Sequence, residues 1–111
     1  MRYLICLFIL FPIGGFAVNL QNCSASSIEQ IITGPKHGAL INLVDNECGN
    51  NGYVCLDIEG EYSSKEKSRV ALAFLFTSYA TEKRIQVTVD LDIKPASCNG
   101  NYPMIDDIRT P

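Results

Sequence analysis

The sequence of 111 residues predicts a mainly β domain with one helix, closed by disulfide bonds. Short apolar segments alternate with clusters of glycine, asparagine and proline, which is typical of strands joined by tight turns. Residues 63–81 instead repeat their apolar side chains with the period of a helix. Four of the five cysteines lie between residues 23 and 98, within the part of the chain that carries these elements.

The first 17 residues have the pattern of a signal peptide. Arg2 supplies a positive charge, residues 3–11 are almost wholly apolar, and Gly15-Phe16-Ala17 places small residues where a signal peptidase cuts. We therefore expect cleavage after Ala17 and a single mature domain over residues 18–111. A membrane anchor is the alternative, but the apolar run is shorter than the ~20 residues that a spanning helix needs. The expected location is periplasmic or secreted, with no stable membrane insertion after cleavage.

Charge and cysteine content limit what the mature domain can be. Removing Arg2 with the leader leaves eight lysines and arginines against 12 acidic residues, a formal charge of −4. An acidic domain without a basic run lacks the surface that phosphate backbones require, so nucleic acid is not an expected partner. An even number of cysteines in a short exported chain predicts two disulfides, whereas a zinc site would usually show a close CxxC pair. The four are Cys23, Cys48, Cys55 and Cys98.

Residues 26–33 and 39–45 are predicted to form a hairpin, because both are rich in Ile, Leu and Val and the turn-forming segment 34–38 separates them. A turn centred on residues 35 and 36 makes the numbers of paired residues sum to 71. The resulting pairs are Ile32 with Ala39, Ile28 with Leu43, and Cys23 with Cys48.

Directly opposed residues on antiparallel strands lie within disulfide reach, with Cα atoms ~4.5 to 5.5 Å apart. This register favours a bond between Cys23 and Cys48 and leaves Cys55 with Cys98. A longer turn would shift the register and leave the other pairings open.

The next elements are a third strand over residues 53–58 and a helix over residues 63–81. Ser63 and Glu66 have the spacing of a capping box, in which each side chain accepts a hydrogen bond from a free backbone N–H of the first turn. Apolar residues cover an unusually wide part of the helix surface. Such a helix either covers the core of a sheet or packs one face on the core and another on a partner.

Two further strands follow the helix. Residues 84–91 alternate strictly between apolar and polar, and residues 104–109 are predicted to form a final short strand. The order of elements is then β-β-β-α-β-β, which matches an OB-type barrel of five strands with its helix between the third and fourth. An open α+β sheet with one covering helix is the alternative.

No constellation for catalysis is evident, and we expect neither an enzyme nor a cofactor or metal. The single histidine, His37, lies in a glycine-flanked turn, where it is expected to be exposed and to lack a positioned partner. The acidic pairs are interpreted as solvated strand edges, since no calcium loop or apolar pocket accompanies them. They are Asp57 with Glu59, Asp90 with Asp92, and Asp106 with Asp107. A small hydrolase that uses Asp90 and Asp92 is the remaining enzymatic alternative.

Residues 99–102 are the candidate ligand-binding segment. Asn99, Asn101 and Tyr102 combine hydrogen-bonding amides with an amphipathic ring on a predicted exposed loop, a combination found on recognition surfaces.

Several features together resemble the B subunit of subtilase cytotoxin and similar small secreted bacterial proteins. They are the exported start, the strand Tyr53-Val54-Cys55-Leu56-Asp57, the helix end Phe76-Thr77-Ser78-Tyr79-Ala80-Thr81-Glu82-Lys83-Arg84, the valine-rich strand after it, and Cys98. The resemblance implies an OB fold, a homo-oligomeric ring of five subunits, and binding of cell-surface glycans or another host surface receptor. The expected function is therefore a non-enzymatic secreted binding module. The alternative is a stand-alone periplasmic protein-interaction domain.

Overall fold

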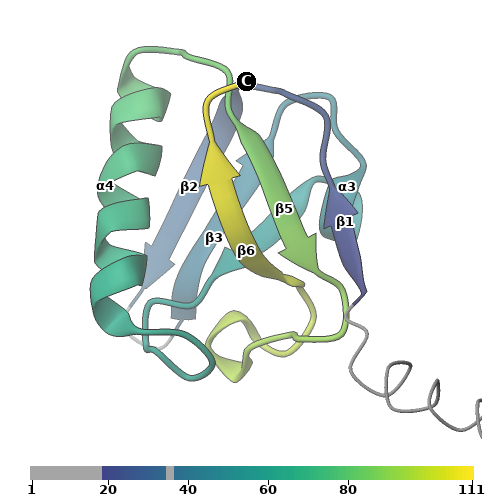
Figure 1. Cartoon of the computed structure of the whole chain (residues 1–111), viewed down its shortest axis with the longest axis vertical. Helices are drawn as coiled ribbons and strands as arrows, with labels where there is room; N and C mark the ends of the chain where they lie inside the picture. Colours follow the sequence, from purple (N-terminus) through teal and green to yellow (C-terminus); the bar gives the residue numbers. More distant parts are fainter. Residues whose placement is uncertain (1–18, 35–36) are drawn as a thin grey trace, which may run out of the picture.

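The computed structural model describes residues 19–34 and 37–111, and within them the chain folds into a six-stranded mixed sheet with one main helix (Figure 1). The expected signal peptide lies outside the described residues. The strands are β1 (Leu20–Asn22), β2 (Ile28–Gly34), β3 (His37–Leu43), β4 (Tyr53–Leu56), β5 (Gln86–Asp90) and β6 (Met104–Arg109). The helices are the short α3 (Cys48–Asn51), the main helix α4 (Lys65–Ala80) and the single 3₁₀ turn η1 (Ala96–Cys98).

The predicted class, mainly β with one helix, is confirmed, but the expected closed five-stranded barrel is not what the described residues form. The strand order is β1-β5-β6-β4-β3-β2, antiparallel throughout except between β4 and β6. Those two strands run parallel and share only the pair Cys55 and Met104. The sheet therefore divides, beyond this pair, into β1-β5-β6 and β4-β3-β2. The strand expected over residues 26–33 is preceded by a separate short strand, β1, which raises the number of strands to six.

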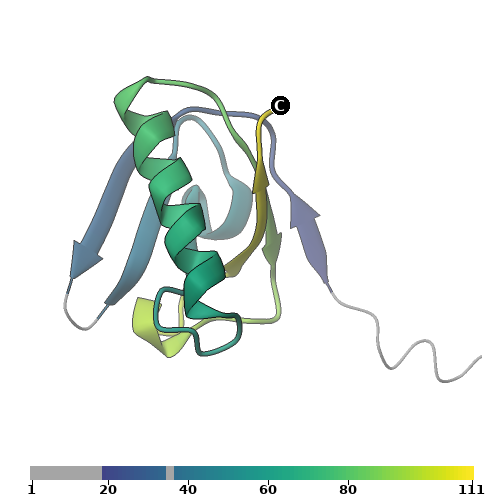
Figure 2. The ribbon, with the colours of Figure 1, turned by 60° about the vertical axis from the view of Figure 1, so that its left-hand side comes forward.

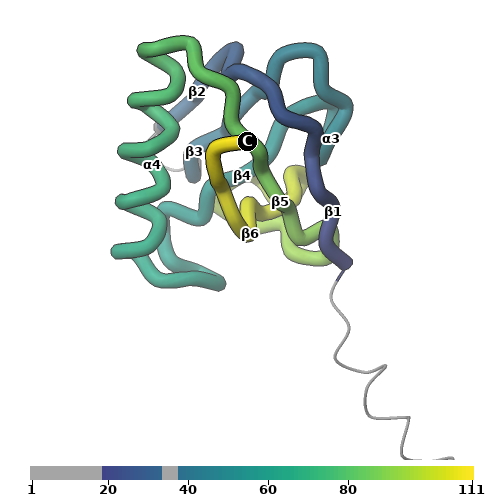
Figure 3. Tube along the Cα trace, turned by 45° about the horizontal axis from the view of Figure 1, so that its top comes forward, coloured from purple at the N-terminus to yellow at the C-terminus, as the bar shows by residue number. Residues whose placement is uncertain are grey.

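The segment between β1 and β2 remains bonded to the start of β5. The backbone N–H of Cys23 donates to the carbonyl oxygen of Val87 at 2.8 Å, and Ser26 and Ile85 exchange two backbone hydrogen bonds. In Figure 3 this part of the chain passes the start of β5 on its way from β1 to β2. The two ends of the strand order are thus connected by the chain itself.

The predicted hairpin is confirmed, with a change of register inside it. Ile28 lies opposite Leu43 as expected, but Ile32 lies opposite Leu40 rather than Ala39. A shift between Ile28 and Gln30 gives β2 one extra residue, and a second shift between Ile32 and Gly34 cancels it, so only the pairs between the two shifts move by one position. Because the two shifts cancel, the pair of Ile28 with Leu43, from which the pairing of Cys23 with Cys48 was extrapolated, is retained.

Helix α4 begins one residue later than the capping pattern predicts. Ser64, not Ser63, is the N-cap, and its hydroxyl oxygen accepts the backbone N–H of Lys67 at 3.0 Å. Figure 2 shows the helix lying across one side of the sheet, where it contacts β2. It buries Leu75 and Ser78, while its remaining surface keeps large apolar side chains exposed. These exposed residues are Val70, Phe76 and Tyr79. The wide apolar surface predicted for this helix therefore exceeds what the sheet covers.

The core lies between α4 and the inner face of the sheet. Its largest fully buried side chains include Ile41, Leu75, Ile85, Val54, Val87 and Val89. In the described part of the chain, no helix is both long enough and apolar enough to cross a bilayer.

Candidate functional site

A groove of about 770 Å³ lies between helix α4 and strand β6. In Figures 1 and 2, β6 has β5 on one side and α4 beyond its other side. The groove is lined from the helix side by Tyr62, Ser63, Ser64, Lys67, Ser68, Val70, Ala71 and Phe74, and from the strand side by Met104, Ile105, Asp106, Asp107 and Ile108. Leu56 and Asp57, at the end of β4, complete it. The groove exists because β4 leaves β6 after one residue pair.

The edge of β6 that faces the groove is free of a partner strand beyond Met104, among the described residues. The two bonds between Ser26 and Ile85 direct the peptide groups of Ile85 away from β6. Peptide groups alternate in direction along a strand, so Gln86 and Thr88 bond to their partners on β6, Arg109 and Asp107. Between these two partners lies Ile108. Its N–H and carbonyl oxygen therefore point away from β5, toward the groove.

The helix wall of the groove is polar at the start of α4 and apolar from Val70 onward. Val70 is 72% exposed and Phe74 is half-buried, so both present apolar surface to the groove. Lys67 is the cation on this wall. The opposite rim carries Asp106 and Asp107, both exposed.

Asp57 closes one end of the groove, and its expected position at a solvated strand edge is wrong. The residue is 1% exposed, and its carboxylate accepts three backbone N–H groups and one hydroxyl from the loop before α4. The shortest of these bonds is 2.7 Å, from the N–H of Tyr62. Burial alone would raise the pKa of this carboxyl, but the N–H groups of Tyr62, Glu61 and Ser63 outweigh it and lower the pKa below the ordinary 3.8.

Asp90 also differs from the expectation of a solvated edge. It is 7% exposed, and its carboxylate accepts the backbone N–H of Asp92 at 3.0 Å. This bond shapes the turn after β5, and Asp92 itself is exposed. The other predicted edge residues, Glu59, Asp106 and Asp107, are exposed as expected.

The predicted ligand segment lies outside the groove. Asn99 and Asn101 are exposed, and Tyr102 is half-buried with its ring centroid 6.0 Å from that of Tyr53. The side-chain amide of Asn50 donates to the carbonyl oxygen of Asn101 at 3.2 Å. The structure thus adds Asn50 and Tyr53 to the predicted residues and makes a small surface of aromatic rings and amides. Spacing along the chain could not predict this surface, since its two halves are about 50 residues apart.

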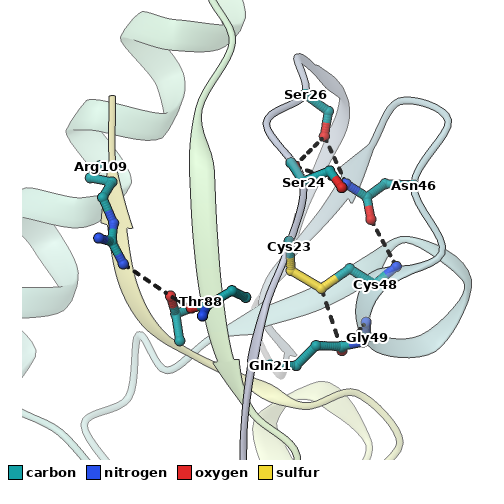
Figure 4. Close-up of a disulfide and its surroundings, with 10 residues drawn as sticks. Gln21, Cys23, Ser24, Ser26, Asn46, Cys48, Gly49, Thr88 and Arg109 are labelled. Carbon is teal, nitrogen blue, oxygen red and sulfur yellow. Dashed lines mark hydrogen bonds between the residues drawn. A yellow bond between two sulfur atoms is a disulfide. The ribbon is translucent and has the colours of Figure 1, made fainter. Parts of the chain in front are cut away.

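The predicted disulfide pairing is confirmed for all four cysteines of the described residues. Cys23 bonds Cys48 with their Cα atoms 5.5 Å apart, and Cys55 bonds Cys98 with their Cα atoms 6.1 Å apart. Figure 4 shows how Asn46 holds the first of these bonds in place.

The amide nitrogen of Asn46 donates to the carbonyl oxygen of Ser24 and the hydroxyl of Ser26, and its oxygen accepts the N–H of Cys48. The loops that carry Cys23 and Cys48 are thereby joined by hydrogen bonds as well as by sulfur.

No group of three or more histidine, cysteine, aspartate or glutamate side chains within the described residues has the arrangement of a metal site. The side chain of His37, expected to be exposed, lies outside the residues whose burial the structure describes. Comparison with family models, with curated proteins and with solved structures found no match to this chain.

The sequence indicated the helix wall of the groove but not the strand wall. The wide apolar surface of the helix indicated a second contact surface, and Val70 and Phe74 were part of that pattern. The free edge of β6 carried no such signal, because it depends on where β4 and β6 separate.

Proposed function

We propose that the protein is an exported, non-enzymatic binding module whose ligand occupies the groove between α4 and β6. The observation that carries this proposal is the groove itself, which is concave, mostly apolar and supplied with a few polar groups at its rim. Ligand sites in proteins are typically clefts of about 300–1,000 Å³ with this composition. The groove of about 770 Å³ falls within that range.

Export is supported by the two disulfides of the described residues, because such bonds persist in the periplasm and outside the cell. The alternative of a protein-interaction domain is supported by the same groove, since exposed apolar residues such as Val70 favour a protein partner.

The test is ligand mapping by NMR on the oxidised protein. The protein is produced by export directed by its own first 17 residues and is recovered afterwards. Panels of peptides, oligosaccharides and fatty acids are titrated, and amide shifts are followed along the chain. We expect the hits to perturb Val70, Phe74 and Ile108, and the exposed substitution Val70→Lys to abolish those shifts. Hits that perturb only residues outside the groove would reject this site.

A second candidate function is glycan recognition at the surface formed by Asn50, Tyr53, Asn101 and Tyr102. Its support is the proximity of two tyrosine rings to two asparagines, together with the resemblance to the toxin B subunit. Glycan-array screening of wild type and Tyr102→Ala tests it, with loss of signal in the variant as the expected result. An absence of any glycan signal in wild type would reject this candidate, and light scattering would test the ring of five subunits.

The order of the strands supports a relationship of this domain to the OB fold, with the barrel open between β4 and β6. If β1 and β2 count as one interrupted strand, the order runs β3, β4, β6, β5 and back to β1. The bonds of Cys23 and Ser26 to β5 support treating them so.

A further inference from the structure

We propose that the occupant of the groove is an extended polypeptide segment, with apolar and basic residues in alternation, that adds as a strand to the free edge of β6. This inference rests on the proposed function for the location of the site and adds the chemistry and geometry of the ligand.

The free edge supplies the first argument. An unpaired strand edge presents a row of N–H and C=O groups that another extended chain can bond, and peptide recognition by strand addition uses such edges. The N–H and carbonyl oxygen of Ile108 point into the groove, as derived from the pairing of Gln86 with Arg109 and of Thr88 with Asp107. A bound peptide backbone would give both groups a partner. A hydrocarbon chain would leave them unpaired, which disfavours a lipid.

The side chains of β6 specify the alternation. Ile108 lies opposite the buried Val87, so it faces the core side of the sheet. Asp107 is the next residue and faces the other side, with more than half of its side chain exposed. Residues of an added strand would share these two faces with their neighbours on β6. One set would contact Ile108 and the apolar helix wall, and the alternate set would lie beside Asp107.

The negative charge of β6 favours basic side chains in the alternate set of ligand residues, the set that would lie beside Asp107. Asp106 and Asp107 are both exposed on this strand, and the ion pair of Asp107 with Arg109, at 3.5 Å, lies at the surface and neutralises only one of them. Opposite charges across neighbouring strands are favourable and like charges are not. Pairing of β6 with β6 of a second copy would bring acidic residues together, so a basic partner segment is favoured over self-association.

The test uses a synthetic peptide of alternating valine and lysine, about seven residues long to match a typical strand. Two control peptides are an alternating valine and glutamate peptide and a valine–lysine peptide N-methylated on one edge. Binding is measured by fluorescence anisotropy, and hydrogen exchange of the Ile108 amide by NMR. We expect the valine–lysine peptide to bind and to slow exchange at Ile108 at least ~10-fold, because a bonded amide is protected. Both control peptides should bind at least ~10-fold more weakly.

Three variants of the protein complete the design. Asp107→Lys should reverse the preference toward the glutamate peptide, and Val70→Lys should weaken binding of the valine–lysine peptide. Phe76→Lys is the matched control, because Phe76 is exposed on α4 but does not line the groove. It should bind like wild type, which would show that an added lysine on the helix does not by itself change affinity.

The possible outcomes distinguish the proposal that the groove is the ligand site from the proposal that a polypeptide adds to β6 as a strand. Peptide binding that is sensitive to Val70→Lys but leaves exchange at Ile108 unchanged would reject strand addition and keep the groove. Fatty acids or oligosaccharides that perturb the groove where the valine–lysine peptide does not would reject the polypeptide ligand and keep the groove. Ligands that perturb only other surfaces would reject both proposals.

Discussion

The hydroxyl of Ser68 donates to the backbone carbonyl oxygen of Asp57 at 2.6 Å, joining the first turn of α4 to the end of β4. The carboxylate of the same aspartate accepts three N–H groups of the loop that connects these elements. One residue therefore holds the start of the helix at the mouth of the groove. The position of the helix wall relative to β6 depends on it.

Replacement of Asp57 by asparagine should destabilise the protein by ~1–3 kcal/mol. The amide keeps the shape of the side chain but has one oxygen in place of two, so buried N–H groups lose an acceptor. Urea unfolding of the oxidised protein measures the change. Asp106→Asn is the matched control at an exposed site and should change stability by less than ~0.5 kcal/mol. Equal stability of the two variants would contradict the role assigned to Asp57.

The lowered pKa of Asp57 predicts how stability depends on pH. A carboxyl whose pKa is lower in the folded state stabilises the fold above its unfolded pKa, near the ordinary 3.8, and this contribution is lost as pH falls through the folded value. We therefore expect unfolding free energy to decline with acidification below about pH 4. In Asp57→Asn this part of the decline should be absent. Parallel pH profiles for wild type and variant would refute the prediction.

The disulfides should contribute unequally to stability. Removing a native disulfide from a small exported domain costs ~2–5 kcal/mol, and the entropic contribution grows with the length of the closed loop. The bond from Cys55 to Cys98 spans 43 residues and that from Cys23 to Cys48 spans 25. Replacing each pair by two alanines and measuring thermal unfolding should show both variants destabilised, with the loss of the longer loop costing ~0.5 kcal/mol more. The opposite order would show that packing at Cys23, not loop length, decides the difference.

Gly52, which follows α3 and precedes β4, should not tolerate alanine. Its φ of 85° lies in the left-handed region, and an added Cβ would meet the carbonyl oxygen of Asn46 at 2.5 Å. Gly100 provides the control, because its φ is 66° but no atom lies within 4 Å of the added Cβ. We expect Gly100→Ala to cost ~1 kcal/mol for backbone strain alone and Gly52→Ala at least ~2 kcal/mol more from the clash. Similar melting temperatures for the two variants would contradict this.

The candidate site was the part of the molecule least accessible to sequence patterns. Asn99, Asn101 and Tyr102 were predicted as loop residues with binding chemistry; in the structure Asn99 and Asn101 are exposed, and Tyr102 is half-buried beside Tyr53. The groove between α4 and β6 was not predicted, although the excess apolar surface of the helix indicated it. Asp57 was interpreted as solvated because it forms an acidic pair with Glu59 that no calcium loop or apolar pocket accompanies in the sequence. The alternation of apolar and polar residues along a strand could not predict the loop that buries Asp57.

Local patterns were sufficient where short-range physics decides the outcome. The mainly β class, the main helix and the pairing of Cys23 with Cys48 follow from periodicity, turn residues and the geometry of one hairpin, all of which act over neighbouring residues. Only the tertiary structure decided that β4 and β6 share a single residue pair, that the sheet stays open there, and that α4 forms the opposite wall of a groove. These features depend on how strands some 50 residues apart meet and twist. No local pattern carries that information.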